Sequence, residues 1–415
     1  MDLLDNGKKL WGENIPWLFG LREKGAMTFS KVGYPNSKTE AWKYSYFPTN
    51  VFDNLQINNN QHKCSKQCSC NINNDIAYDN YFISVCNGKL KDHHFDFCKG
   101  LKVKPLIEAI YDNEIKKYLN KSFNMEKFPF ASLNTAFIEQ GIVVLVEQNA
   151  KIDKPLYIHY SQKENNNELY CFRNIIIMES RSNISIIEHF SGCDNTFYIR
   201  NNVNEIFISN EAKLNHYKYI NEANQAYHIT LNSVIEKSNA EYKQFCAIKE
   251  SAFTRNETII KLQDKGACAN VDGVYKQNDK GLSDITTNIL HLAPHTISNQ
   301  LVKGILDNNG KGVFQGKIHV APDAQQIEGY QLHKALLLND NAEVNCKPEL
   351  EIYADDVKCS HGATSGNIDE EQLFYLQSRG ISKNDAKKIL IDAFLKETFD
   401  CVSEPIIKEW LKNKF

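Results

Sequence analysis

The sequence has no long apolar run and no large excess of charge of either sign. No segment of its 415 residues approaches the roughly 18 consecutive apolar residues that a membrane-spanning helix needs. Its first residues, Met1 to Asp5, are acidic, whereas a signal or transit peptide would carry Lys or Arg. The formal net charge is −3, which gives no basic field for nucleic acid or an anionic membrane. We therefore expect a cytoplasmic protein whose partners are proteins, with no nucleic acid and no membrane among them.

The usual catalytic signatures are also absent. There is no G-x-S-x-G nucleophile elbow and no H-E-x-x-H metalloprotease helix. The stretch from Gly312 to Lys317 has only three residues between its glycines, and Ile318 stands where a phosphate loop has Ser or Thr. The sequence therefore predicts no hydrolase chemistry and no nucleotide site, and we interpret the chain as a protein that is not an enzyme by itself.

Cysteine, by contrast, is plentiful. The twelve cysteines are scattered along the chain, so we expect free thiols and no disulfide framework. Four soft metal ligands gather in the polar segment 58–74, namely His62, Cys64, Cys68 and Cys70. Their C-x3-C-x-C spacing matches none of the zinc patterns, which favours a flexible loop with incidental thiols over a metal site.

The chain divides into three regions by pattern. Residues 1–135 are expected to be mainly helical, with helices over Leu4–Lys24, broken at Pro16, and over Leu101–Leu119. Residues 136–365 have the short β-branched and aromatic runs of a β domain, and residues 366–415 return to a helical pattern.

The β region carries an internal repeat. A small residue beside a polar one recurs at steps of about 28 residues, which favours stacked coils over a sandwich with closely spaced strands. A six-residue repeat, which a left-handed solenoid needs, is not found, so we expect a right-handed parallel β-helix flanked by N-terminal and C-terminal helical regions. The repeated pairs are Asn149-Ala150, Ser182-Asn183, Glu211-Ala212, Asn239-Ala240, Gly266-Ala267, His295-Thr296, Asp323-Ala324 and Asn341-Ala342.

A thiol, an imidazole and carboxylates crowd together where the β region ends. If the chain is extended from Tyr353 to His361, then Asp355, Cys359 and His361 share one face. Thiolate and imidazole suit zinc, copper or iron, but two ligands fall short of a closed site unless another chain supplies the rest. The alternative is that Cys359 is a small buried apolar residue and His361 a hydrogen-bonded turn residue. Four other histidines (His291, His295, His319 and His333) are expected to be packing or surface residues.

Two capped helices are expected after Gly366. The first has acids in its first turn after Asp369 and ends at Gly380, and the second begins with a Ser382/Asp385 capping box. The first helix has apolar side chains pointing in several directions, which either a partner protein or the last helix (Ser403–Lys412) could cover. These side chains are Leu373, Phe374, Tyr375 and Leu376, and the expected buried face of the second helix is Ala386, Ile389, Leu390, Ala393 and Phe394.

Several segments resemble the SufB/SufD family of iron–sulfur cluster assembly proteins. The last two C-terminal segments and the two N-terminal ones resemble its SufD branch. The resemblance covers most of the chain and is strongest over about residues 315–400, whereas the Cys-rich stretch from Asn58 to Cys70 matches nothing in the family. The segments are Tyr34–Tyr44, Ser132–Ala136, Lys317–Gln326, Leu336–Asp340, Ala342–Val344, Lys347–Thr364 and Asp369–Ile381.

The resemblance implies the same fold and a function. Such proteins are scaffold subunits that pair with a SufB-like subunit through their β-helices and engage a SufC-like ABC-type ATPase through their C-terminal helices. A nascent iron–sulfur cluster forms at the interface of the pair, with His361 in the position of a ligand and Cys359 nearby. Reduced flavin is associated with the assembled complex, at residues that cannot be placed here, and an isolated chain could form a homodimer.

Two alternatives stay open at this point. One is a stand-alone metal-binding or redox protein. The other is a β-helix carbohydrate-active enzyme, which would need paired carboxylates in a cleft. Asp355 and Asp356 are adjacent and would point to opposite faces of a strand, which argues against the second alternative.

Overall fold

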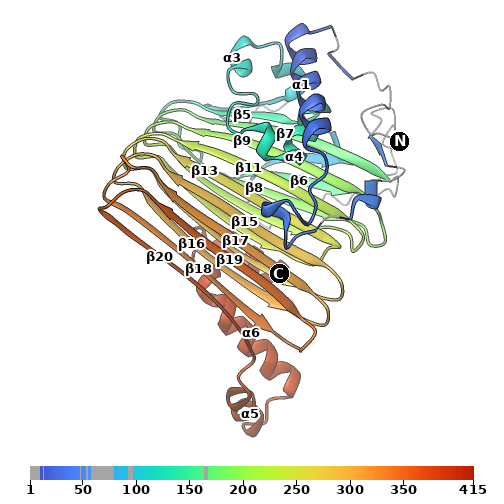
Figure 1. Ribbon diagram of the computed structural model, residues 1–415, viewed down its shortest axis with the longest axis vertical. Helices are drawn as coiled ribbons and strands as arrows, with labels where there is room; N and C mark the ends of the chain where they lie inside the picture. Colours follow the sequence, from blue (N-terminus) through green and yellow to red (C-terminus); the bar gives the residue numbers. More distant parts are fainter. Residues whose placement is uncertain are drawn as a thin grey trace.

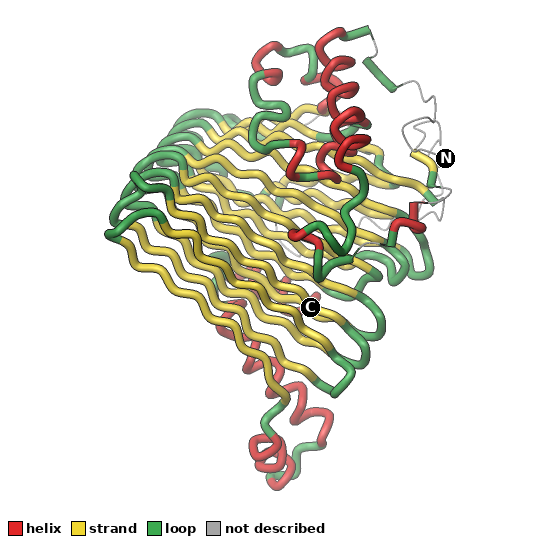
Figure 2. Tube along the Cα trace, viewed as in Figure 1, coloured by secondary structure: helices red, strands yellow, loops and turns green. Residues whose placement is uncertain are grey.

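The computed structural model describes residues 10–12, 14–46, 48–52, 55–57, 79–91, 97–162 and 167–415. Over these residues the chain forms a parallel β-solenoid with helices toward both termini (Figures 1 and 2). The predicted parallel β-helix with flanking helical regions is therefore confirmed. The segment 58–74, with His62, Cys64, Cys68 and Cys70, lies outside the described residues.

Each coil of the solenoid contributes one strand to each of two facing sheets, and each sheet has ten strands within the described residues. We call them the odd sheet and the even sheet after their strand numbers. The long strands of the odd sheet are β5 (Ile142–Val146), β7 (Glu168–Met178), β9 (Ile199–Ile208), β11 (Tyr227–Glu236), β13 (Phe253–Leu262), β15 (Leu282–His291), β17 (Lys311–Val320) and β19 (Glu343–Ile352). Those of the even sheet are β6 (Leu156–Gln162), β8 (Asn183–Gly192), β10 (Lys213–Asn221), β12 (Glu241–Ile248), β14 (Cys268–Gln277), β16 (Ile297–Leu306), β18 (Ile327–Leu337) and β20 (Val357–Asn367).

The predicted repeat corresponds to one corner of each coil. Five of its polar or glycine positions have a left-handed backbone with φ between 54° and 74°, which Asn and Gly adopt most easily. The small residue that follows is half-buried at Ala150 and buried at the other four corners, as with Ala212, Ala240 and Ala267, each at most 1% exposed. A period of about 28 residues therefore marks the length of one coil. The left-handed residues are Asn149, Glu211, Asn239, Gly266 and His295.

The N-terminal end of the solenoid is closed by short strands. β3 (Lys89–Leu90) pairs antiparallel with β2 (Tyr81–Cys86), and β4 (Leu101–Pro105) pairs antiparallel with β5. Near this end, β1 (Gln56–Ile57) pairs with β7.

The predicted helix over Leu101–Leu119 is wrong in its first part. Residues 101–105 alternate between buried and exposed and form strand β4, because their alternation of apolar and lysine side chains fits one sheet face. Two short helices follow, α2 (Leu106–Ala109) and α3 (Asn113–Lys116).

N-terminal helices cover the outer face of the odd sheet (Figure 1). The two longer ones are α1 (Pro16–Val32) and α4 (Pro129–Ala136), and the 3-10 helices are η2 (Glu40–Trp42), η3 (Thr49–Phe52) and η4 (Met125–Lys127). Pro16 begins α1 where the sequence predicted a break in a longer helix, because proline fits the first turn of a helix.

The C-terminal helices are α5 (Glu370–Ser378), α6 (Lys383–Phe399) and α7 (Pro405–Lys414). Leu395, Phe399 and Trp410 pack on aromatic side chains of the outer face of the even sheet. In Figure 1, α5 projects beyond the last coil. No helix among the described residues has the length and apolar character needed to cross a membrane.

The predicted buried face of α6 is only partly correct. Ala386 is buried, but Ile389 is 45% exposed and Ala393 is also exposed. The residues that α6 buries lie mainly in its C-terminal half, Leu395, Thr398 and Phe399, because that half contacts the sheet.

Candidate metal centre at the open end of the solenoid

The C-terminal end of the solenoid is not closed in the way the N-terminal end is. The last strands of the two sheet orders are β19 and β20, and within the described residues neither pairs with a strand beyond it. Every residue of β20 is half-buried or exposed. The two last strands therefore present free backbone edges and an uncovered end of the interior.

Cys359 and His361 lie on β20 and face this uncovered end. Cys359 pairs with Gly329 of β18, and its side chain packs with a small apolar cluster that includes Ile318 and Leu350. Burial raises the pKa of the Cys359 thiol. His361 is two residues further along the strand, on the same face, and is exposed. The structure thus places the thiol and the imidazole on one strand face, as predicted.

The predicted place of Asp355 on that face is wrong. β19 ends at Ile352 and β20 begins at Val357, so Asp355 and Asp356 lie in the turn between the strands. The backbone N–H of Asp356 donates a hydrogen bond to Gln325 Oε1 at 2.9 Å. This bond holds the turn against the turn of the preceding coil, between β17 and β18. Neither carboxylate belongs to the strand that carries Cys359 and His361.

A second thiol and imidazole lie at this end, and sequence reasoning did not select them as ligands. Cys346 of β19 and His333 of β18 cross the interior, with Cys346 Sγ 2.9 Å from His333 Nδ1. On its other side, His333 Nε2 is 2.9 Å from the Tyr275 hydroxyl. Burial lowers the pKa of His333 to about 4 and raises the pKa of Cys346 to about 11, so both are neutral near pH 7. Within the described residues, no three potential ligands are close enough to hold a metal ion.

Two of the other histidines contact polar side chains of the solenoid. His291 is buried and hydrogen-bonds with Thr296 and Ser298. His319 contacts Glu351 at 3.1 Å across the odd sheet. These two fit the prediction of packing or surface residues.

Deeper in the solenoid, the buried carboxylate of Glu188 contacts a histidine and a lysine side chain. Glu188 is 2.9 Å from His216 Nε2 and 3.2 Å from Lys218 Nζ. Burial acts to raise the pKa of Glu188, but the positive charge of Lys218 and the hydrogen bond from His216 lower it overall. Because its partners saturate this carboxylate, we interpret the group as structural.

The first C-terminal helix leaves part of its apolar surface uncovered. Asp369 caps α5 by accepting hydrogen bonds from the backbone N–H groups of Glu371 and Gln372. Leu373 is buried, whereas Phe374 is 72% exposed and Tyr375 is 56% exposed. The predicted apolar surface is therefore reduced to Phe374 and Tyr375, with Leu376 half-buried.

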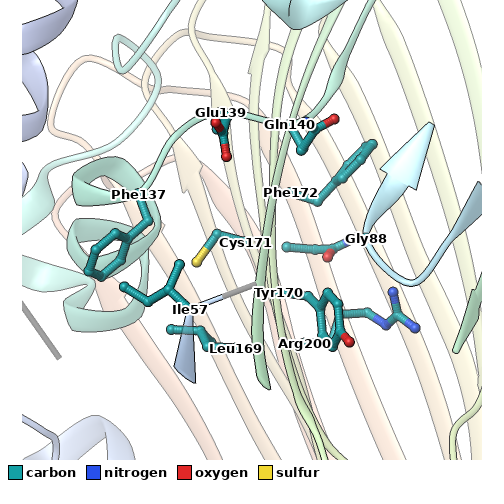
Figure 3. Close-up of a pocket in the computed structure, with 11 residues that line it drawn as sticks. Ile57, Gly88, Phe137, Glu139, Gln140, Leu169, Tyr170, Cys171, Phe172 and Arg200 are labelled. Carbon is teal, nitrogen blue, oxygen red and sulfur yellow. The ribbon is translucent and has the colours of Figure 1, made fainter. Parts of the chain in front are cut away.

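The cavity in Figure 3 lies far from these residues in the fold, near the N-terminal coils. Residues of β7 and neighbouring elements line it, among them Tyr170, Cys171 and Arg200. Its volume of about 20 Å³ is room for about one water molecule. It is therefore too small for a cofactor or substrate.

Comparison with known proteins identifies the family. Residues 2–158 match the SufBD protein N-terminal region, and residues 159–394 match the SufBD core domain of the SUF system for FeS cluster assembly. The chain belongs to the SufB/SufD family.

Relatives of this SufB/SufD family protein come from bacteria and a plant chloroplast. It is 28% identical to the iron–sulfur cluster assembly protein SufD of Escherichia coli over 382 residues, 91% of this chain and 88% of that protein. It is 30% identical to the chloroplastic protein ABCI7 of Arabidopsis thaliana over 68% of this chain, and 28% identical to a SufBD family protein of Synechocystis over 65% of it. Each of these two matches spans 62% of the relative's own length. The family resemblance seen in the sequence is confirmed.

Proposed function

We propose that this protein is a scaffold subunit, without catalytic activity of its own, of a cytoplasmic iron–sulfur cluster assembly complex of the SufBCD type. The observation that carries the proposal is the position of Cys359 and His361, two soft ligands on the last strand of a solenoid whose end is uncovered. Two ligands are too few for a closed metal site, so such a position suits a site that a second chain completes.

The partner proposed for this end is a SufB-like subunit. Free strand edges at β19 and β20 can extend both sheets into a second solenoid, which would satisfy their unpaired backbone groups. The isolated chain could use the same edges to form a homodimer. In the heterodimer the nascent cluster is the cargo, held transiently by His361 and by ligands of the partner, with Cys359 next to it.

The C-terminal helices are proposed to dock a SufC-like ABC-type ATPase. Phe374 and Tyr375 of α5 are exposed on a helix that projects beyond the last coil (Figure 1). Leu376 is half-buried beside them, and the buried Leu373 supports the helix from its inner side. The ATPase would supply the nucleotide chemistry, and we assign no residue of this chain to a reduced flavin in the complex.

Anaerobic iron titration tests the shared site. The chain alone and the chain with a SufB-like partner are each titrated with Fe²⁺ and sulfide, and the bound iron and cluster absorption are measured. We expect stable cluster on the pair and little on the single chain. Tight iron binding that is the same with and without the partner would contradict the proposal and indicate a stand-alone metal-binding or redox protein.

A further inference from the structure

A cavity of about 810 Å³ lies between the outer face of the even sheet and the helices α6 and α7. Its volume is within the range of about 300 to 1,000 Å³ that is typical of small-molecule sites. No residue of β20, the strand that carries Cys359 and His361, lines it. The fold therefore leaves a ligand-sized space at the base of the C-terminal helices, apart from the candidate metal centre.

The floor of this cavity is apolar. Ile305 of β16 and Leu395 and Phe399 of α6 are each at most 5% exposed and belong to the cluster that joins the helices to the sheet. Because water in the cavity would contact this apolar surface, an apolar ligand group is favoured there. Three further apolar side chains line the wall and are half-buried, namely Leu338, Ile391 and Phe415.

Lysine side chains surround the apolar floor. They come from three separate elements, which are the end of β14 and the helices α6 and α7. None of their ammonium groups has a hydrogen bond or an ion pair with another residue in the part of the chain that the structure describes. The four lysines are Lys276, Lys388, Lys396 and Lys412.

The carboxylate side chains at the cavity are fewer, and two of the three already have partners in this chain. Asp307 accepts a hydrogen bond from the Asn339 side chain at 3.0 Å. Glu409 accepts one from the Asn413 side chain at 3.3 Å, and Asp392 of α6 is the third carboxylate. The unpartnered ammonium groups therefore outnumber the unpartnered carboxylates, so the head group that this cavity favours is an anion.

We propose that this cavity binds a long-chain acyl anion, with its chain on the apolar floor and a carboxylate or phosphate head among Lys388, Lys396 and Lys412. Both kinds of head group accept charge-assisted hydrogen bonds from ammonium groups. A bound molecule would contact α6, α7 and the even sheet at once. The site is separate from Phe374 and Tyr375 of α5 and does not depend on the proposed function.

Calorimetric titration with dodecyl probes tests the ligand class. The full chain is titrated with laurate, dodecyl phosphate and dodecyltrimethylammonium, each below its micelle concentration, and with inorganic phosphate. We expect one molecule of laurate or of dodecyl phosphate to bind per chain, and the tighter of the two identifies the head group. The cation and inorganic phosphate should not bind at the same concentrations. Equal binding of either of these, or no binding of the two dodecyl anions, would overturn the proposal.

Variants of α6 test the location. Lys388→Glu combined with Lys396→Glu should lower the affinity for the anion by about tenfold or more, because two ammonium groups near its head become carboxylates. Lys383→Glu combined with Lys387→Glu, on the same helix but outside the lining, is the matched control. Ala393→Trp fills the cavity from an exposed position and should abolish binding while the thermal midpoint of the free chain stays unchanged. Equal losses in the two lysine variants, or binding retained by Ala393→Trp, would contradict a site in this cavity.

Discussion

Cys359 and His361 could be paired from the sequence because they are two residues apart on one predicted strand. Strand geometry alone places such residues on one face. Cys346 and His333 could not be paired in this way, because they are 13 residues apart and lie in different sheets. The one sequence feature that points to Cys346 is the predicted corner at Asn341-Ala342. Ala342 is buried, so the alternate residues that follow it, Val344 and Cys346, face the interior of the solenoid.

A half-buried aspartate on β14 gives a residue-scale prediction for the pH dependence of stability. Burial raises the pKa of Asp272 to about 7, from an ordinary value of 3.8. In the unfolded chain the group ionises near pH 4, so its protonated form stabilises the fold at low pH. This contribution is lost as pH rises through 7.

Between pH 5 and 8, the free energy of unfolding of the wild-type protein should fall more than that of Asp272→Asn. We expect the difference to be about 2 kcal/mol, after discounting for the partial solvent exposure of Asp272. Urea unfolding at the two pH values measures this difference. Asp194→Asn, on an exposed loop, is the control and should keep the wild-type dependence. An equally steep loss of stability in Asp272→Asn would contradict the assignment.

At the scale of elements, the solenoid was predictable because its corners repeat a chemical requirement. A left-handed residue followed by a small buried one recurs at four successive corners, Glu211-Ala212, Asn239-Ala240, Gly266-Ala267 and His295-Thr296. Helical periodicity was a poorer guide. Leu101–Pro105 joined the odd sheet as β4, and the buried face of α6 was decided by where the helix meets the even sheet. In both cases tertiary contacts decided the outcome, and a local sequence pattern does not contain them.

The projecting helix α5 yields a prediction about docking. Phe374→Ala combined with Tyr375→Ala should weaken binding of a SufC-like ATPase at least tenfold, because burying each side chain is worth about 1.5 to 3 kcal/mol. The thermal midpoint of the isolated chain should not change, since both side chains are exposed. Calorimetric titration measures the affinity.

Met27→Ala combined with Tyr111→Ala serves as the control for that measurement. Both residues are exposed, at 73% and 65%, in the N-terminal region, on the other side of the solenoid from α6 and α7. Unchanged ATPase affinity in the α5 variant, or the same loss in the control, would argue against docking at Phe374 and Tyr375.

At the scale of the whole molecule, the two ends of the solenoid differ. Antiparallel strands close the N-terminal end, whereas β19 and β20 leave the other end uncovered within the described residues. Sequence periodicity predicts coils but says nothing about which end is covered. That asymmetry is what favours assembly with a second solenoid at one end only.

A charge placed at the uncovered end should block pairing. Ala363 is exposed and shares the inward face of β20 with Cys359, so Ala363→Lys should leave the isolated chain folded. In a pair of joined solenoids the ammonium group would be buried without a partner, which we expect to weaken association by about 100-fold or more. Thr364→Lys, on the outer face of the same strand, is the matched control. Sedimentation with a SufB-like subunit distinguishes them, and equal association of the two variants would contradict pairing through this end.

Cluster assembly with a His361 variant tests the central claim most directly. His361→Ala removes an exposed imidazole and little buried apolar surface, so the complex with SufB-like and SufC-like proteins should still form. Cluster formation on that complex, followed by its absorption under anaerobic conditions, should be abolished or strongly reduced. Cys359→Ser should be milder if the thiol is only a neighbour and comparably severe if both residues bind one ion. Assembly by His361→Ala at the wild-type rate would contradict a metal role for this strand.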